Sequence, residues 1–86
     1  MQTITSIVSR LFNNISIEDF IYCFEKIKEN GDVGVIKFDG DRKDKQYTVF
    51  ITFSTIKAEM IRADESTLKE ALFKVLLKYI EVREGV

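Results

Sequence analysis

Residues 66–82 of this chain read STLKEALFKVLLKYIEV, a stretch that glycine and proline do not interrupt. At 100° per residue the apolar side chains of this stretch cover an arc of roughly 240°, far wider than the stripe of an ordinary surface helix. We therefore predict a helix over residues 66–82 that packs against its own sheet and also against a second helix or another chain. The sheet is expected to take Leu68, Leu72, Val75 and Tyr79, and the neighbouring helix Ala71 and Leu76. Phe73 and Leu77 have no assigned contact.

Two shorter helices are predicted upstream. Residues 3–12 place apolar side chains at helical spacing, and those of Ile4, Ile7 and Leu11 are expected to cover an apolar surface elsewhere in the chain. Residues 17–29 carry a narrower apolar stripe. Ser16 and Asp19 have the spacing of a weak capping box at the start of this helix, and Asn30-Gly31 is a typical helix end.

Three strands are predicted between the helices, over residues 32–38, 46–53 and 55–62. Alternation in the second strand places Tyr47, Val49, Ile51 and Phe53 on one face and Phe50 on the other. The third strand is expected to turn Ile56, Ala58 and Met60 inward and Ile61 outward, after a tight turn at Ser54. The order ααβββα predicts an α+β fold, in which helices 17–29 and 66–82 cover one face of a three-stranded antiparallel sheet. The helix at residues 3–12 either covers the other face or leaves it to a partner.

Composition narrows the function classes. The 86 residues suffice for one domain, with 45% hydrophobic residues, 31% charged residues and a net charge of −1. The absence of histidine excludes histidine-based triads and histidine metal sites. Cys23 is interpreted as a structural thiol. The chain is expected to be a soluble cytoplasmic protein that is not an enzyme and has no cofactor, metal, membrane anchor or small-molecule substrate.

The loop at residues 39–45 is the densest charge cluster. Its residues Asp41, Arg42, Lys43 and Lys45 form a candidate contact loop, with a solvated turn as the alternative. A cation site built from Asp39, Asp41 and Asp44 is disfavoured, because the twelfth position, where a calcium-binding loop needs glutamate, is Phe50.

Residues 17–82 are similar, in the order of their predicted elements, to the double-stranded-RNA-binding domain. In that family a basic cluster at the start of the final helix grips phosphates. Here Ala63-Asp64-Glu65-Ser66 is acidic, with only Arg62 and Lys69 beside it. Nucleic-acid binding, through Arg42, Lys43, Lys45 and Lys57, is therefore the alternative interpretation.

In size, composition and lack of catalytic motifs the chain also resembles small accessory proteins of phages and mobile elements, including inhibitors of CRISPR and other host defences. That resemblance implies an inhibitor that occupies a surface of a larger complex. The leading hypothesis is a non-catalytic protein-binding module that binds a second copy of itself or another protein. The alternative is a monomer in which the first helix and the rest of the chain bury all of the large apolar surface. The expected interface residues of the binding module are Phe73, Leu77, Phe50 and Ile61.

Overall fold

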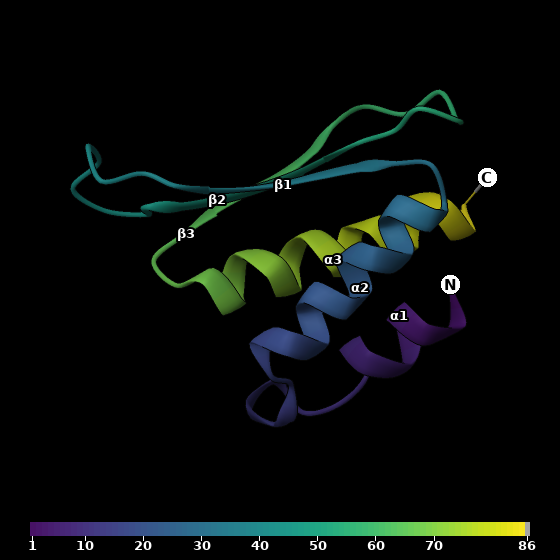
Figure 1. The fold of residues 1–86 in the computed structure, drawn as a ribbon, viewed down its shortest axis with the longest axis horizontal. Helices are drawn as coiled ribbons and strands as arrows, with labels where there is room; N and C mark the ends of the chain where they lie inside the picture. Colours follow the sequence, from purple (N-terminus) through teal and green to yellow (C-terminus); the bar gives the residue numbers. More distant parts are fainter. Residues whose placement is uncertain (86) are drawn as a thin grey trace.

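Three antiparallel strands form a sheet in the order β1-β2-β3, and the helices all lie on one side of it in a computed structural model that describes residues 1–85 (Figure 1). The elements are α1 (Gln2–Val8), the short 3-10 helix η1 (Phe12–Asn14), α2 (Ile17–Glu29), β1 (Val33–Phe38), β2 (Tyr47–Thr52), β3 (Ile61–Glu65) and α3 (Leu68–Glu84). The predicted α+β class and element order are confirmed. Across residues 1–85 no helix combines the length and apolarity that crossing a membrane requires.

Side-chain caps begin both long helices, and the one predicted at Ser16 and Asp19 is confirmed. The Ser16 side chain accepts a hydrogen bond from the Asp19 backbone, and the Asp19 carboxylate accepts one from the Ser16 backbone, which completes the capping box of α2. At the start of α3 the Thr67 hydroxyl accepts from the Glu70 N–H. These local bonds satisfy amide groups that a helix leaves unpaired at its first turn.

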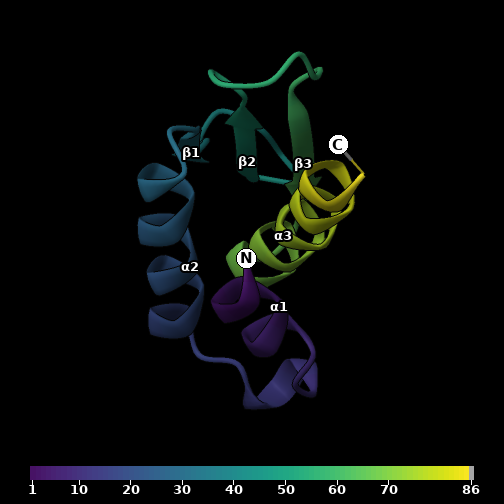
Figure 2. The same cartoon turned by 90° about the vertical axis from the view of Figure 1, so that its right-hand side faces the viewer.

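The wide apolar arc of α3 is explained by contacts on two sides within the chain. On the sheet side, the Tyr79 ring stacks on Phe53 with centroids 5.6 Å apart. On the other side, the Phe73 ring packs edge-to-face with two aromatic rings. Its centroid lies 5.3 Å from that of Phe12 and 6.4 Å from that of Phe20. Helix α1 packs against both other helices and lies beneath α3, on the side away from the sheet, and beside one half of α2 (Figures 1 and 2). The second layer is therefore supplied by the chain itself, and α1 leaves the opposite face of the sheet uncovered.

The first helix is shorter than predicted. It ends at Val8 rather than at residue 12, and the Ser9 hydroxyl donates to the Ser6 carbonyl in its last turn. Ile4 and Ile7 are buried as expected, whereas Leu11 is 76% exposed and covers nothing. The chain turns at Leu11 so that the following 3-10 turn can place Phe12 against Phe73.

The third strand was predicted wrongly. Residues 53–60 form an irregular connection, with bends at residues 54–56, instead of a tight turn and a strand, and β3 begins at Ile61. The pairing of Ile51 with Ile61 and of Val49 with Ala63 turns Ile61 toward the helices, where it is buried, and leaves Met60 50% exposed. A one-residue difference in phase reverses the face of every side chain in a strand, which is why the predicted inward set was wrong.

A buried carboxylate joins three distant parts of the fold. Asp32 was predicted to begin the first strand, but it precedes β1, and its side chain is fully buried. Its carboxylate accepts hydrogen bonds from the Tyr79 hydroxyl at 2.7 Å and from Arg83 Nε at 3.0 Å, both on α3. The other oxygen accepts from the Ser54 N–H at 3.3 Å, in the connection after β2. Asp32 therefore fixes the end of α3 against the start of β1 and the end of β2.

Replacing Asp32 by alanine is expected to lower the free energy of unfolding by about 3–5 kcal/mol, because Arg83 and Tyr79 would lose their buried acceptor. Urea unfolding followed by circular dichroism measures this loss. The matched control is Asp41→Ala, which removes an exposed aspartate and should change stability by less than about 0.5 kcal/mol. Equal losses in the two variants would contradict the role given to Asp32.

Candidate functional site

The four predicted interface residues do not form one surface. Phe73 is partly buried between Phe12 and Phe20 of the same chain, and Ile61 is buried on the helix-facing side of the sheet rather than on its open side. Phe50 lies half-buried on the open face, opposite Val35 and Arg62. Leu77 is 42% exposed on α3. The structure therefore leaves Phe50 and Leu77 accessible, on separate elements.

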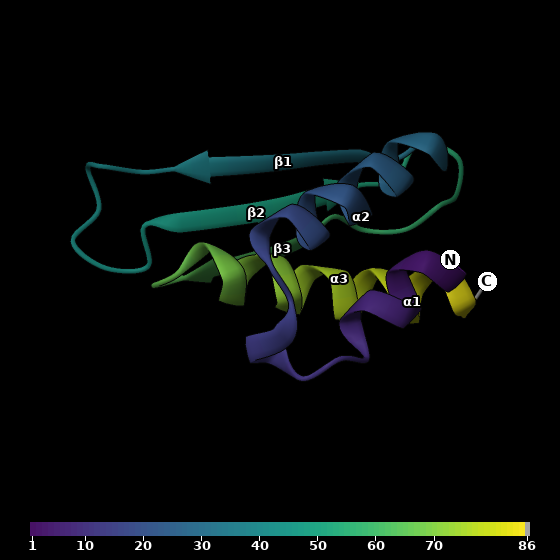
Figure 3. The same cartoon turned by 60° about the horizontal axis from the view of Figure 1, so that its bottom comes forward.

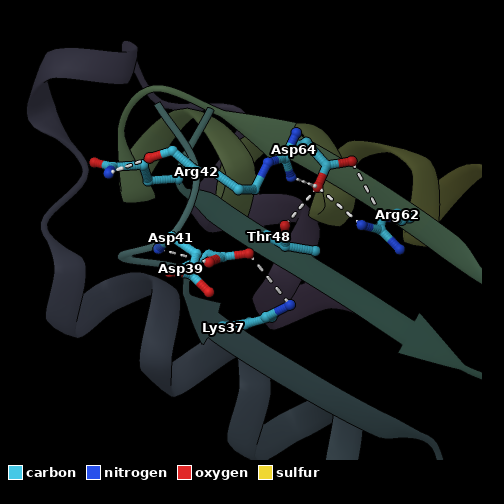
Figure 4. Close-up of polar contacts among 8 residues, drawn as sticks. Lys37, Asp39, Asp41, Arg42, Thr48, Arg62 and Asp64 are labelled. Carbon is cyan, nitrogen blue, oxygen red and sulfur yellow. Dashed lines mark hydrogen bonds and ion pairs between the residues drawn. The ribbon is translucent and has the colours of Figure 1, made fainter. Parts of the chain in front are cut away.

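The predicted contact loop takes part in a polar cluster on the open face of the sheet (Figure 4). The Arg42 guanidinium reaches Asp64 on β3, with Nη1 and Oδ1 3.1 Å apart. The Asp41 N–H donates to the Asp39 carboxylate, which also faces Lys37 at 3.4 Å. Lys43 and Lys45 are exposed, and Lys45 adopts a left-handed backbone conformation with φ 47°. Of the four residues predicted for a nucleic-acid contact, Arg42 is thus paired with a carboxylate, whereas Lys43, Lys45 and Lys57 are exposed.

Asp64 is the centre of this cluster. Its carboxylate accepts hydrogen bonds from Arg62 Nε at 3.0 Å, from Arg42 and from the Thr48 hydroxyl. The Arg62 guanidinium, followed by the Thr48 hydroxyl, holds the pKa of the Asp64 carboxyl well below its ordinary value. Because the folded-state pKa is lowered, the ionised carboxylate stabilises the fold above the ordinary aspartate pKa, and this contribution is lost as the pH falls.

The variant Asp64→Asn should therefore be less stable than the wild type near neutral pH, and the difference should shrink in acid. Urea unfolding of both proteins at about pH 7 and at about pH 2.5 measures this, since the two conditions lie on either side of the ordinary aspartate pKa of about 3.9. A difference in unfolding free energy that is the same at both pH values would show that the ionised carboxylate contributes nothing.

The two edges of the sheet carry backbone groups that point away from β2. The Asp39 N–H donates to the Gln46 carbonyl, 2.8 Å away, which fixes the alternation of hydrogen-bonded pairs between β1 and β2. It follows that Gly34, Ile36 and Phe38 direct their N–H and C=O groups outward from β1. The same alternation carried through β2 leaves the backbone groups of Arg62 and Asp64 directed outward from β3.

The β1 edge borders an apolar groove of about 350 Å³, which we call the β1–α2 groove. It is lined by Ile21, Phe24, Glu25, Lys28, Asp32, Val33 and Gly34. The Phe24 ring lies over the backbone of Gly34, where an added Cβ would come within 2.6 Å of the ring. Figure 2 shows α2 below the β1 edge, with no strand of residues 1–85 beyond β1. Figure 3 shows the same arrangement from the helix side.

Four large apolar side chains near this edge or on α2 are exposed to solvent. Ile21 is 43% exposed, Val33 48% and Phe38 68%, and Ile17 on the first turn of α2 is also accessible. None of these side chains was among the predicted interface residues. The signal was present in residues 33–38, which are apolar on both faces, because a strand needs apolar residues on both faces only where both are covered.

The β3 edge borders a larger groove of about 690 Å³, between the strand and α3. On the helix side its wall consists of Lys74, Lys78 and Val82. Lys74 binds the Glu65 carboxylate at 2.8 Å, and Lys78 lies 3.4 Å from Glu81. This edge is therefore charged, in contrast to the apolar edge at β1.

The side chains that could carry covalent or metal chemistry have contacts that serve the packing of the fold. Cys23 is buried in the core, and burial raises the pKa of its thiol to about 11, so it is protonated at neutral pH. Burial, followed by the hydrogen bond to Asp32, raises the pKa of the Tyr79 hydroxyl. Within residues 1–85, histidine, cysteine, aspartate and glutamate side chains form no group of three that could hold a metal ion.

Comparison with known proteins gives no relative: the chain matches no protein-family model, no curated protein and no solved structure. The resemblances to the double-stranded-RNA-binding domain and to phage accessory proteins therefore stay predictions.

Proposed function

We propose that this chain is a non-catalytic, cytoplasmic protein-binding module that accepts an extended apolar segment of a partner protein as a fourth strand beside β1. The observation that carries this proposal is the β1–α2 groove, where an unpaired strand edge lies above an exposed apolar helix. The inhibitor role implied by the resemblance to phage proteins is one form that this binding could take.

The backbone of β1 supports an extended occupant. The outward N–H and C=O groups of Gly34, Ile36 and Phe38 recur at the spacing of a strand ladder, which only another extended chain can match. A strand added there buries these polar groups in hydrogen bonds, so its main chain supplies affinity that does not depend on its sequence.

The side chains of the groove support an apolar occupant. Alternate side chains of an added strand would point toward the helix layer and meet Ile21 and Phe24. Burial of such side chains contributes about 25 cal/mol to the binding free energy for each Å² of apolar surface removed from water. Lys28 and Glu25, at the rim, are paired with each other at 2.8 Å, so they offer no net charge to a partner.

The proposal is tested by selecting binders from a random twelve-residue peptide library against the full chain. The enriched peptides should alternate apolar and polar residues, and their binding should slow exchange of the Gly34, Ile36 and Phe38 amides with solvent deuterium. Ile21→Asp should weaken the enriched peptides by about tenfold or more, as expected when an apolar anchor is lost.

Leu77→Asp is the matched control, because Leu77 is 42% exposed against 43% for Ile21 and also lies on a helix. It should leave peptide binding unchanged. A selection that enriches no peptide, or peptides that Leu77→Asp weakens and Ile21→Asp does not, would overturn the proposal.

A further inference from the structure

We propose that two copies of this chain pair through the outer edges of their β3 strands, antiparallel and centred on Ala63, so that the two sheets join into one. This inference rests on the β3 edge and the proposed function on the β1 edge, so either can fail without the other.

The backbone of β3 restricts how two copies can pair. The Arg62 and Asp64 backbone groups point outward, so hydrogen-bonded pairs across the new interface must be formed between these residues. Three registers are then possible within β3. Pairing centred on Arg62 places Arg62 opposite Arg62 of the second copy, and pairing centred on Asp64 places Asp64 opposite Asp64. Pairing centred on Ala63 places Arg62 opposite Asp64.

The charges select one of these registers. Arg62 and Asp64 share the open face of the sheet, since they lie opposite Phe50 and Thr48 on β2. Like charges placed directly opposite each other destabilise a sheet, and opposite charges stabilise it. Within each copy, Arg62 Nε already lies 3.0 Å from the Asp64 carboxylate. Only the register centred on Ala63 also places each Arg62 opposite an Asp64 of the second copy, twice because the pairing is symmetric, so that the two ion pairs lie side by side with opposite charges adjacent. The edge is thus complementary to a copy of itself, as a closed two-fold dimer requires.

The surroundings of β3 leave room for the second strand. A groove of about 690 Å³, lined on the helix side by Lys74 and Lys78, opens beside the edge. Lys74 reaches across it to the Glu65 carboxylate, 2.8 Å away. At the centre, Ala63 would face Ala63 of the second copy as a pair without direct hydrogen bonds, where the two backbones approach most closely. The methyl side chain of Ala63 is small enough for this close approach of the two backbones. The β1–α2 grooves remain at the two outer ends of the joined sheet.

Amide hydrogen exchange of the wild-type chain, measured residue by residue at micromolar and millimolar concentration, tests the inference. The Arg62 and Asp64 amides should exchange more slowly at the higher concentration, while the Ala63 amide, which β2 already protects, should change little. Sedimentation should show twice the chain mass in parallel. Unchanged exchange of Arg62 and Asp64, or concentration-dependent protection of Gly34, Ile36 and Phe38 instead, would overturn it.

A charge variant tests the register. Arg62→Glu places glutamate opposite Asp64 on both sides of the axis and should shift sedimentation to the monomer. Lys43→Glu makes the same change of charge in the exposed β1–β2 loop and should leave the dimer intact. Circular dichroism of both variants reports whether each is folded. A folded Arg62→Glu variant that still sediments as a dimer, or dissociation by Leu77→Asp instead, would overturn the inference.

Discussion

The arrangement of this fold depends on the buried carboxylate of Asp32. An ionised group removed from water is costly unless its partners compensate, and here Tyr79, Arg83 and the Ser54 N–H do so together. Because these partners come from α3 and from the end of β2, the carboxylate is satisfied only when helix and sheet are correctly placed. It therefore sets how α2, which leads directly into Asp32, and α3 lie beneath the sheet. The shape of both edge grooves follows from that placement.

The apolar arc of α3 is accounted for within the chain by layering. The sheet takes one side of the helix, and α1, η1 and α2 take the other, so that Phe73 is partly buried between Phe12 and Phe20 and packs against the core. This use of α1 has a consequence for the sheet. Within residues 1–85, α1 is committed to the core and no helix covers the opposite face, which carries the Asp64 cluster.

The two edges of the sheet differ in the chemistry that they offer. The β1 edge presents apolar side chains above an exposed part of α2, which favours an extended apolar segment but does not select one sequence. The β3 edge presents one arginine and one aspartate, two residues apart, on the same face. Charge order of this kind contributes little affinity but discriminates strongly between registers, because a shift places like charges together.

Sequence alone determined the elements whose signals are local. The capping box and apolar stripe of α2, the alternation of β2 and the long periodic run of α3 each involve residues within about four positions of one another, and each was predicted within two residues of its observed bounds. The α+β class followed from their order. Contacts inside such short segments do not depend on the rest of the chain, and their pattern can therefore be recognised in the sequence.

Tertiary structure decided the start of β3, the fate of Leu11, the burial of Asp32 and the location of the accessible apolar surface. Alternation in residues 55–62 was real, but it could not show that Ile51 pairs with Ile61 and thereby turns Ile61 inward. Likewise, Asp32 was predicted to begin a strand, and its burial arises only when Tyr79 and Arg83, 47 and 51 residues away, come into contact with it. These features depend on which distant segments share the limited space around one core, and that competition is settled only when the whole chain is packed.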